Sequence, residues 1–172
     1  MDKGKLRQKY REIRNSVTND TVAKTLLEWD LFKNAKTVMT YISAKGEADT
    51  YPILQSGKQL YVPVTFKQEG IIKACEFKGT DKLVKGEYGI MEPDTINVYD
   101  GGFDLIIVPA ICYNKKGYRV GYGGGYYDKF LHTKKGVTAG FCFEECLIDE
   151  NFQAQFDRKV DYIITQERII KT

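Results

Sequence analysis

A nearly continuous apolar run, Leu105-Ile-Ile-Val108, constrains the fold of this chain more than any other feature. A strand that is covered on one face alternates apolar and polar residues, whereas a strand covered on both faces is apolar throughout. The run over residues 160–165 has the same character, with Asp161 as its one charged residue. Both runs predict central strands of a largely parallel sheet with helices on both faces, which is an α/β fold.

The remaining elements are consistent with this class of fold. Short runs rich in β-branched and aromatic residues predict four more strands, at 37–42, 59–65, 71–77 and 137–143. Residues 2–17 are predicted to form a helix, since Leu6, Tyr10, Ile13 and Val17 recur along one face. Asn19 or Asp20 is expected to cap a second helix that ends near residue 28. With 172 residues, 42% of them apolar, and no linker-like tract, the whole chain, 1–172, is predicted to be one domain.

Charge and cysteine content exclude several classes of protein. The chain has 26 Lys and Arg against 23 Asp and Glu, too small an excess to favour nucleic-acid binding. Its four cysteines are too few and too far apart for a disulfide scaffold. The charged N-terminal residues do not resemble a secretory signal, and no apolar run is long enough to cross a membrane. We therefore expect a soluble, cytoplasmic protein with free thiols.

The strongest functional signal is the segment 117–131, which has glycine at 121, 123, 124 and 125 directly before a short predicted helix. Glycines allow backbone N–H groups to approach a ligand closely, and the start of a helix attracts anions. Neither the P-loop pattern nor the G-x-G-x-x-G dinucleotide pattern is present. The segment predicts a phosphate-binding loop of another kind, although a glycine turn without a ligand is the simpler alternative.

Charged residues near this loop suggest what it binds. Asp128, in the predicted helix, either caps the helix or holds a cation beside a phosphate. On the first helix, Lys3, Arg7, Arg11 and Arg14 lie beside the apolar stripe, whereas Lys5 and Lys9 point the other way. They are either a solvated basic face or donors to a bound phosphate. Glu47 follows the first predicted strand, where ligands of α/β sheets bind. The single histidine, His132, is assigned no role.

Several motifs, in register over nearly the whole chain, resemble the 5-formyltetrahydrofolate cyclo-ligase family. The most specific of them is Gly117-x-Arg119-Val-Gly121-x-Gly123-Gly124-Gly125-Tyr126-Tyr127-Asp128. The others are Lys3-x-x-Leu6-Arg7, Ser43…Glu47…Thr50, Gly89-x-x-Glu92-Pro93, Val108-Pro109-Ala110 and the segment 160–165. The resemblance implies a three-layer α/β/α domain that uses ATP and Mg²⁺ to convert 5-formyltetrahydrofolate to 5,10-methenyltetrahydrofolate.

The resemblance also implies roles for individual residues. Catalysis would fall to Lys3, Arg7, Arg119 and Tyr126. ATP would contact Lys3, Arg7 and the segment Arg119, Val120, Gly121, Tyr122, Gly123, Gly124, Gly125, Tyr126 and Tyr127. The folate would contact Ile42, Glu47, Tyr122 and Tyr126, and Mg²⁺ would bind Asp128 and Asp161. The implied partners are small molecules, namely ATP and a folate with or without a polyglutamate tail, and the chain would act as a monomer or homodimer without nucleic acid or membrane.

Four positions depart from the family pattern. Tyr122 stands where some members have arginine and Gly124 where some have lysine, so phosphate binding would depend more on Lys3, Arg7 and Arg119. Asn114 and Gln166 replace the more usual acids. Two rival functions remain open: an enzyme of sugar phosphates or coenzyme A esters on a related α/β fold, and a small RNA- or partner-binding protein that uses the basic first helix.

Overall fold

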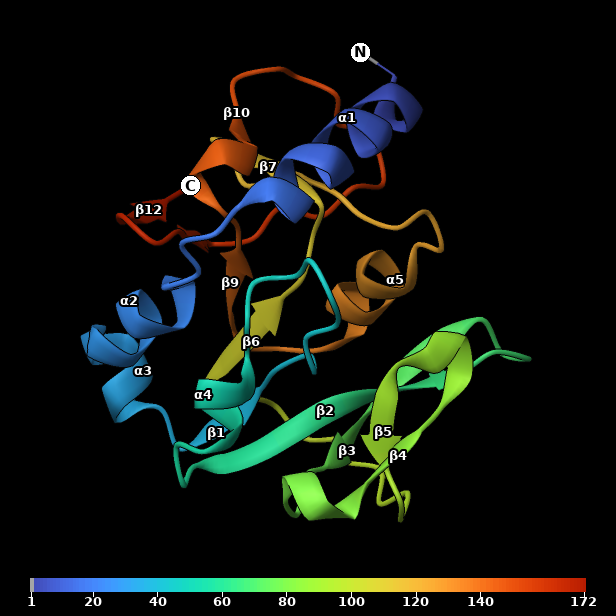
Figure 1. The fold of residues 1–172 in the computed structure, drawn as a ribbon. Helices are drawn as coiled ribbons and strands as arrows, with labels where there is room; N and C mark the ends of the chain where they lie inside the picture. The colour runs from blue at the N-terminus through green and yellow to red at the C-terminus, as the bar shows by residue number, and fades with distance from the viewer. Residues whose placement is uncertain (1) are drawn as a thin grey trace.

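A seven-stranded sheet forms the centre of the computed structural model, which describes residues 2–172 (Figure 1). The strand order is β12-β11-β9-β6-β1-β2-β3. In chain order the bounds are β1 Thr37–Met39, β2 Gln59–Phe66, β3 Ile71–Glu76, β6 Leu105–Val108, β9 Val137–Phe141, β11 Tyr162–Ile164 and β12 Ile169–Lys171. Every neighbouring pair from β11 to β2 is parallel, and the two outermost pairs are antiparallel. The largely parallel sheet predicted from the apolar runs is confirmed.

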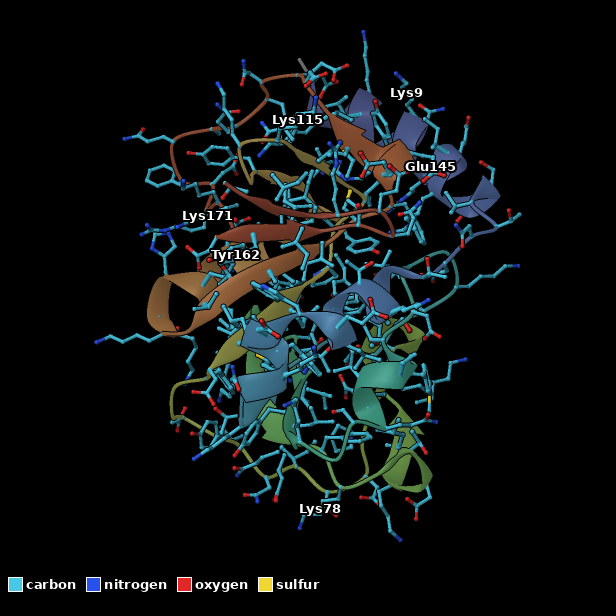
Figure 2. All side chains as sticks on the ribbon, turned by 90° about the vertical axis from the view of Figure 1, so that its left-hand side faces the viewer. Lys9, Lys78, Lys115, Glu145, Tyr162 and Lys171 are labelled. Atoms are coloured by element: carbon cyan, nitrogen blue, oxygen red, sulfur yellow. The ribbon has the colours of Figure 1, made fainter. Side chains whose placement is uncertain are left out.

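All six predicted strands are present, and β6 has the predicted bounds. Each β6 side chain is fully buried, as expected for a strand covered on both faces. Strands β1, β9 and β11 are shorter than predicted, because the chain beyond them turns into loops. The edge strand β12 was not predicted; in Figure 2 its Lys171 lies beside Tyr162 of β11, its partner in the antiparallel register.

Five α-helices were found in the described residues: α1 Lys3–Ser16, α2 Val22–Glu28, α3 Asp30–Asn34, α4 Tyr51–Leu54 and α5 Tyr126–Thr133. Helix α1 confirms the predicted first helix, and the Asp2 carboxylate caps it by accepting a 2.8 Å hydrogen bond from the Gly4 N–H. The predicted cap of α2 was wrong, since Thr21 precedes the helix. Asp20 instead accepts a 2.8 Å hydrogen bond from the Asp49 N–H, so tertiary contact decides its role.

The order of the strands places the helices in two layers. The chain passes from β1 through α4 to β2 on one side of β1, and from β6 through α5 to β9 on the other. Right-handed crossovers in opposite directions put α4 and α5 on opposite faces of the sheet. Figure 1 shows α2, α3 and α4 on one face and α5 on the other, which is α/β/α layering. The crossover direction reverses between β1 and β6, so this fold has its topological switch point there.

Two small sheets lie beside the central one. The first, ordered β10-β7-β8, contains β7 Cys112–Asn114, β8 Arg119–Val120 and β10 Leu147–Ile148. The second is the hairpin of β4 Leu83–Lys85 and β5 Met91–Pro93. Three 3-10 turns, η1 Thr80–Lys82, η2 Glu87–Gly89 and η3 Glu144–Cys146, complete the elements found in residues 2–172. None of the helices described is long and apolar enough to cross a membrane.

Helix α1 lies outside the two layers, above the carboxyl ends of the central strands (Figure 1). Leu6 and Tyr10 are buried against the core, and the helix contacts β7, β8 and η3. Lys9 lies on its outer side, as predicted, at the opposite end of the molecule from Lys78 (Figure 2). Of the basic residues next to the buried stripe, Lys3, Arg7 and Arg14 face the carboxyl ends of the strands, whereas Arg11 is exposed.

Candidate active site

A cavity of about 700 Å³ opens at the carboxyl ends of β1 and β6, at the switch point. This volume lies within the range of small-molecule sites in proteins, about 300–1,000 Å³. Its walls come from α1, the segment after β1, strands β2 and β3, the β4–β5 hairpin, and the loop between β8 and α5. The site is therefore assembled from segments far apart in the sequence.

The glycine segment forms the loop between β8 and α5. Gly123 and Gly125 have φ angles of +108° and +67°, which residues with a side chain adopt only at a cost. Gly125 is the N-cap of α5, whose first hydrogen bond runs from the Lys129 N–H to the Gly125 carbonyl. The N–H groups of the preceding helical residues have no partner within the helix. An anion bound at this helix start would accept hydrogen bonds from these N–H groups.

Arg7 joins helix α1 to this loop. Its Nε donates a 2.8 Å hydrogen bond to the Gly121 carbonyl, across a sequence separation of 114 residues. Its Nη2 atom lies 3.7 Å from the place that a Cβ on Gly123 would occupy. The Arg7 guanidinium therefore lies next to the loop backbone, and glycine at 123 is favoured by its positive φ rather than by lack of space.

The charged residues of the cavity wall are mostly basic. Five are cations, Lys3, Arg7, Arg14, Lys45 and Arg119, and two are carboxylates, Glu47 and Asp128. Within residues 2–172, Arg7 and Lys45 form no salt bridge. A wall with surplus positive charge, next to a helix start, is suited to a polyanionic ligand.

Arg119 and Asp128 form an ion pair in the wall. Arg119 Nη2 lies 2.6 Å from Asp128 Oδ1, and Arg119 Nη1 donates a 2.8 Å hydrogen bond to the Arg158 carbonyl. The Arg119 side chain is 5% exposed and that of Asp128 is 34% exposed. Hydrogen bonds found for Asp128 in the described chain all go to Oδ1, from Arg119 and from the Arg158 N–H. Asp128 thus does not cap α5, and its Oδ2 accepts no hydrogen bond within the described chain.

Lys3 pairs with an aspartate that the sequence did not single out. Its Nζ lies 2.5 Å from Asp157 Oδ2. Asp157 directly precedes Arg158, whose N–H bonds to Asp128, so both aspartates adjoin the cationic wall. Asp161 lies elsewhere: its carboxylate accepts hydrogen bonds of 2.9 Å from the Thr138 N–H and hydroxyl, before β11. The structure therefore does not bring Asp161 to the cavity, and among residues 2–172 no cluster of three metal-binding side chains exists.

Another part of the wall is apolar and aromatic. It contains Tyr41, Ile42, Pro63, Ile72, Tyr88, Ile90, Pro109 and Tyr126. Tyr88, at the tip of the β4–β5 hairpin, is 63% exposed, and its hydroxyl lies 3.3 Å from that of Tyr126. Tyr88 also has a φ of +56°, a strained conformation for a bulky residue. A flat apolar ring fits such a wall.

Two polar atoms in the cavity-lining residues are buried without a hydrogen-bond partner in the described chain: Arg14 Nε and the Tyr127 hydroxyl. Burial raises the pKa of Tyr127, with the nearby Glu47 carboxylate as a second cause, so its hydroxyl stays protonated. An unsatisfied buried polar group costs about 1–3 kcal/mol. A ligand that bonded to these atoms would remove that cost.

Most of the predicted site residues meet at this cavity. Those that line it are Lys3, Arg7, Ile42, Glu47, Arg119, Gly121, Tyr122, Gly123, Gly124, Gly125, Tyr126, Tyr127 and Asp128. Val120 is fully buried in β8 and does not line it, and Arg11 is not among the lining residues. Sequence reasoning missed Tyr41, Lys45, Pro63, Thr65, Ile72, Tyr88 and Ile90. For Tyr88 the only local signal was its position between Gly86 and Gly89.

The cysteines are buried, as expected for small core residues. Burial raises the pKa of the Cys112 and Cys146 thiols to about 12 and that of Cys75 to about 11. Thiols with such pKa values are protonated at neutral pH and are poor nucleophiles. Cysteine nucleophilic catalysis is not supported.

Known proteins resemble the chain in sequence and in structure. The model of the 5-formyltetrahydrofolate cyclo-ligase family matches residues 1–166. The mitochondrial 5-formyltetrahydrofolate cyclo-ligase of Arabidopsis thaliana is 31% identical over 134 residues, 66% of this chain and 48% of the relative. The 5-formyltetrahydrofolate cyclo-ligase of Escherichia coli K12 is 26% identical over 147 residues, 78% of this chain and 80% of the relative. The chain thus spans about half the length of the Arabidopsis relative.

Among solved structures, the NMR structure of Aquifex aeolicus 5,10-methenyltetrahydrofolate synthetase superposes with a TM-score of 0.85. The two sequences are 27% identical, and the match covers 99% of this chain and 93% of that one. The similarity therefore includes the central sheet and the segments that line the cavity.

Proposed function

Because the chain belongs to the 5-formyltetrahydrofolate cyclo-ligase family, we propose that it converts 5-formyltetrahydrofolate to 5,10-methenyltetrahydrofolate while ATP becomes ADP and phosphate. The observation that carries this proposal is a single cavity with two kinds of wall. One part is cationic, beside a glycine loop and a helix start, and suits a triphosphate. The other is apolar and aromatic, contains Glu47, and suits a pterin ring.

The proposed reaction has two steps. The formyl oxygen attacks the γ-phosphorus of ATP, which breaks the bond to ADP and leaves a phosphorylated iminium at N5. N10 then attacks the formyl carbon and loses its proton, the five-membered ring closes, and phosphate leaves. Such phosphoryl transfer requires positioning and charge neutralisation more than a protein nucleophile. The absence of a thiolate nucleophile is consistent with this chemistry.

The positions of the cationic side chains support this proposal. Lys3, Arg7 and Arg119 lie around the glycine loop, where they would bind the phosphates together with the backbone N–H groups of the segment 121–127. The ion pair with Asp128 holds Arg119 in place. The phenol of Tyr126 lies at the cavity wall near Tyr88, where it would contact the folate.

The carboxylates near the loop fit a magnesium ion. Mg²⁺ prefers oxygen ligands and binds few protein carboxylates when phosphates are its other ligands. We propose Asp128 as the protein ligand, because it lines the cavity and its Oδ2 accepts no hydrogen bond within the described chain, whereas Asp161 lies outside the cavity wall. When bound, Mg²⁺ would neutralise charge on the transferred phosphate.

The remaining parts of the proposal concern the context of the enzyme. We propose that residues 1–172 act as one domain, as a monomer or homodimer, on ATP and a folate, without a nucleic acid or membrane partner. The cytoplasm is the proposed location.

A spectrophotometric assay for methenyltetrahydrofolate tests the proposal, with ATP and Mg²⁺ omitted in turn and phosphate release followed in parallel. The expected result is product formation that requires both, with one phosphate per ring closed. ATP-independent turnover of a sugar phosphate or a coenzyme A ester, with no folate product, would replace the proposal with the rival enzyme class.

A matched pair of variants on α1 tests the cationic wall. Arg7→Met removes a guanidinium that lies over the loop, whereas Lys9→Met removes a cation from the outer side of the same helix. Arg7→Met is expected to raise the KM for ATP about tenfold, the cost of one charge-assisted hydrogen bond, and the KM for folate by less than twofold. Equal increases in both constants would contradict the phosphate role, and Lys9→Met should change neither.

A further inference from the structure

Three polar side chains from distant segments form one chain of hydrogen bonds in the cavity wall. Arg14, on α1, donates from Nη1 to the Tyr122 hydroxyl oxygen over 2.7 Å. The Tyr122 hydroxyl donates in turn to Glu47 Oε1. The other carboxylate oxygen, Oε2, accepts a 2.8 Å hydrogen bond from the Ala44 N–H. This relay, Arg14–Tyr122–Glu47, connects the basic helix to the segment after β1.

The chemistry of its two ends fixes the direction of the relay. An arginine can only donate hydrogen bonds, and an ionised carboxylate can only accept them. The phenol between them must therefore accept from Arg14 and direct its own proton at Glu47. Desolvation, and then the Glu47 carboxylate beside it, raise the pKa of Tyr122, so that the proton stays on the phenol. The hydrogen bonds therefore run from Arg14 to Tyr122 and from Tyr122 to Glu47, and not in the opposite direction.

The ring of Tyr122 is also held in place. The guanidinium carbons of Arg14 and Arg11 lie 5.5 Å and 5.9 Å from its centroid, within the distance of cation–π contacts. Arg14 itself is 7% exposed, and its Nη1 lies 3.4 Å from the Ala110 carbonyl. Tyr122 is 47% exposed, but both its ring and its hydroxyl contact the buried Arg14 side chain.

The relay determines how Glu47 meets a ligand. Each carboxylate oxygen accepts one hydrogen bond from the protein, one from Tyr122 and one from Ala44, and each keeps further acceptor capacity. A carboxylate held at both oxygens presents its remaining lone pairs in one fixed orientation. The matching ligand group is an edge with two adjacent N–H donors, as in the aminopyrimidine ring of a pterin.

We propose that Tyr122 is a positioning residue. Its hydroxyl, which accepts a hydrogen bond from Arg14, donates to the Glu47 carboxylate and so orients this carboxylate toward the pterin edge of the folate. This inference rests on the proposed function. It also gives a physical account of tyrosine at a position where some family members have arginine. Here Arg14 supplies the cation, and the Tyr122 phenol links Arg14 to Glu47 through two hydrogen bonds.

A double-mutant cycle on folate binding tests the inference. The variants are Tyr122→Phe, which keeps the ring and removes only the hydroxyl, Glu47→Gln, and the double variant. The dissociation constant for 5-formyltetrahydrofolate is measured by calorimetry without ATP, and the KM for each substrate is measured separately. Tyr118→Phe is the matched control, because Tyr118 lies outside the cavity wall.

We expect Tyr122→Phe to weaken folate binding about tenfold, which corresponds to one charge-assisted hydrogen bond. The ATP KM and the kcat at saturating folate should change by less than twofold. In the Glu47→Gln background the same substitution should have little further effect, because the residue through which it acts is already altered. The control variant should bind folate like the parent.

Several results would overturn the inference. Additive losses in the double variant would show that the hydroxyl contacts the ligand directly rather than through Glu47. A raised ATP KM with unchanged folate binding would assign the hydroxyl to the nucleotide. Both results leave the proposed function intact if the parent protein forms product. A parent that binds no folate would overturn the inference and the proposed function together, whereas a parent that binds folate without turnover still permits the cycle.

Discussion

Replacing Asp128 with asparagine tests whether this residue supports the fold as well as the chemistry. The substitution keeps the size of the side chain and removes its charge, so that the Arg119 guanidinium, 5% exposed, loses its anionic partner. Breaking a buried pair costs about 3–5 kcal/mol and breaking an exposed pair about 0–1 kcal/mol. Because Asp128 is 34% exposed, the expected loss lies between these, at about 2 kcal/mol.

For a chain of this size, about 2 kcal/mol lowers the Tm by about 4–8 °C. Urea unfolding and thermal scans followed by circular dichroism would measure both quantities. The matched control is Asp149→Asn. Its pair with Lys115 has a similar distance of 2.7 Å, but the side chains are 80% and 53% exposed, so the expected loss is below about 0.5 kcal/mol.

Repeating the substitution in an Arg119→Met variant shows whether the lost stability comes from this ion pair. In Arg119→Met the cation is already gone, and Asp128→Asn should then cost little. If the substitution costs the same in both backgrounds, or if the Tm of Asp128→Asn equals that of the parent, the reasoning is refuted. Any loss of turnover in an Asp128 variant must therefore be measured well below its Tm before it is attributed to a lost metal ligand.

Three further predictions concern the loop, the thiols and a surface carboxylate. Gly125→Ala should lower the free energy of unfolding by about 1–2 kcal/mol, measured in urea, because φ is +67° there, although a Cβ would meet no atom within 4 Å; an unchanged value would argue against strain. The four buried thiols should react with a maleimide at pH 8 far more slowly in the folded than in the urea-unfolded protein, as followed by mass spectrometry, since burial raises the pKa of Cys112 to about 12; rapid labelling of the folded protein would contradict this. Hydrogen bonds from the Thr37 and Lys36 N–H groups lower the pKa of Asp104, so its carboxylate stabilises the fold above its unfolded pKa of about 4 and loses this effect as the pH falls through the lower folded value. Asp104→Ala should accordingly lower the Tm at pH 7, and the difference from the parent should shrink in acid; a difference that grew in acid would have the wrong sign.

The sequence predicted the central sheet well because its strands are read from local composition. Leu105–Val108 is apolar at every position, and that pattern needs no knowledge of its neighbours. The strands of the two small sheets are two to three residues long, too short to show a period. The cap of α2 failed for a related reason, since Asp20 bonds to a residue 29 positions away.

Part of the candidate site could likewise be predicted from local sequence, and part depends on tertiary packing. The glycine loop and Asp128 are contiguous in the sequence, so their motif could be read directly. The pairing of Lys3 with Asp157 and of Tyr122 with Glu47 depends on how distant segments pack. The hairpin that carries Tyr88 reaches the cavity only through its tertiary position, which local composition does not encode.

Helix α1 is synthesised long before the residues to which it bonds in the folded protein. Lys3, Arg7 and Arg14 bond to residues 108–154 positions further along the chain. At roughly 5–20 residues per second, those partners are made about 5–30 s after the helix itself. Until then Lys3, Arg7 and Arg14 lack these partners, and the cationic wall of the cavity is not assembled. The cavity should therefore be completed late, after residues 117–158 have left the ribosome.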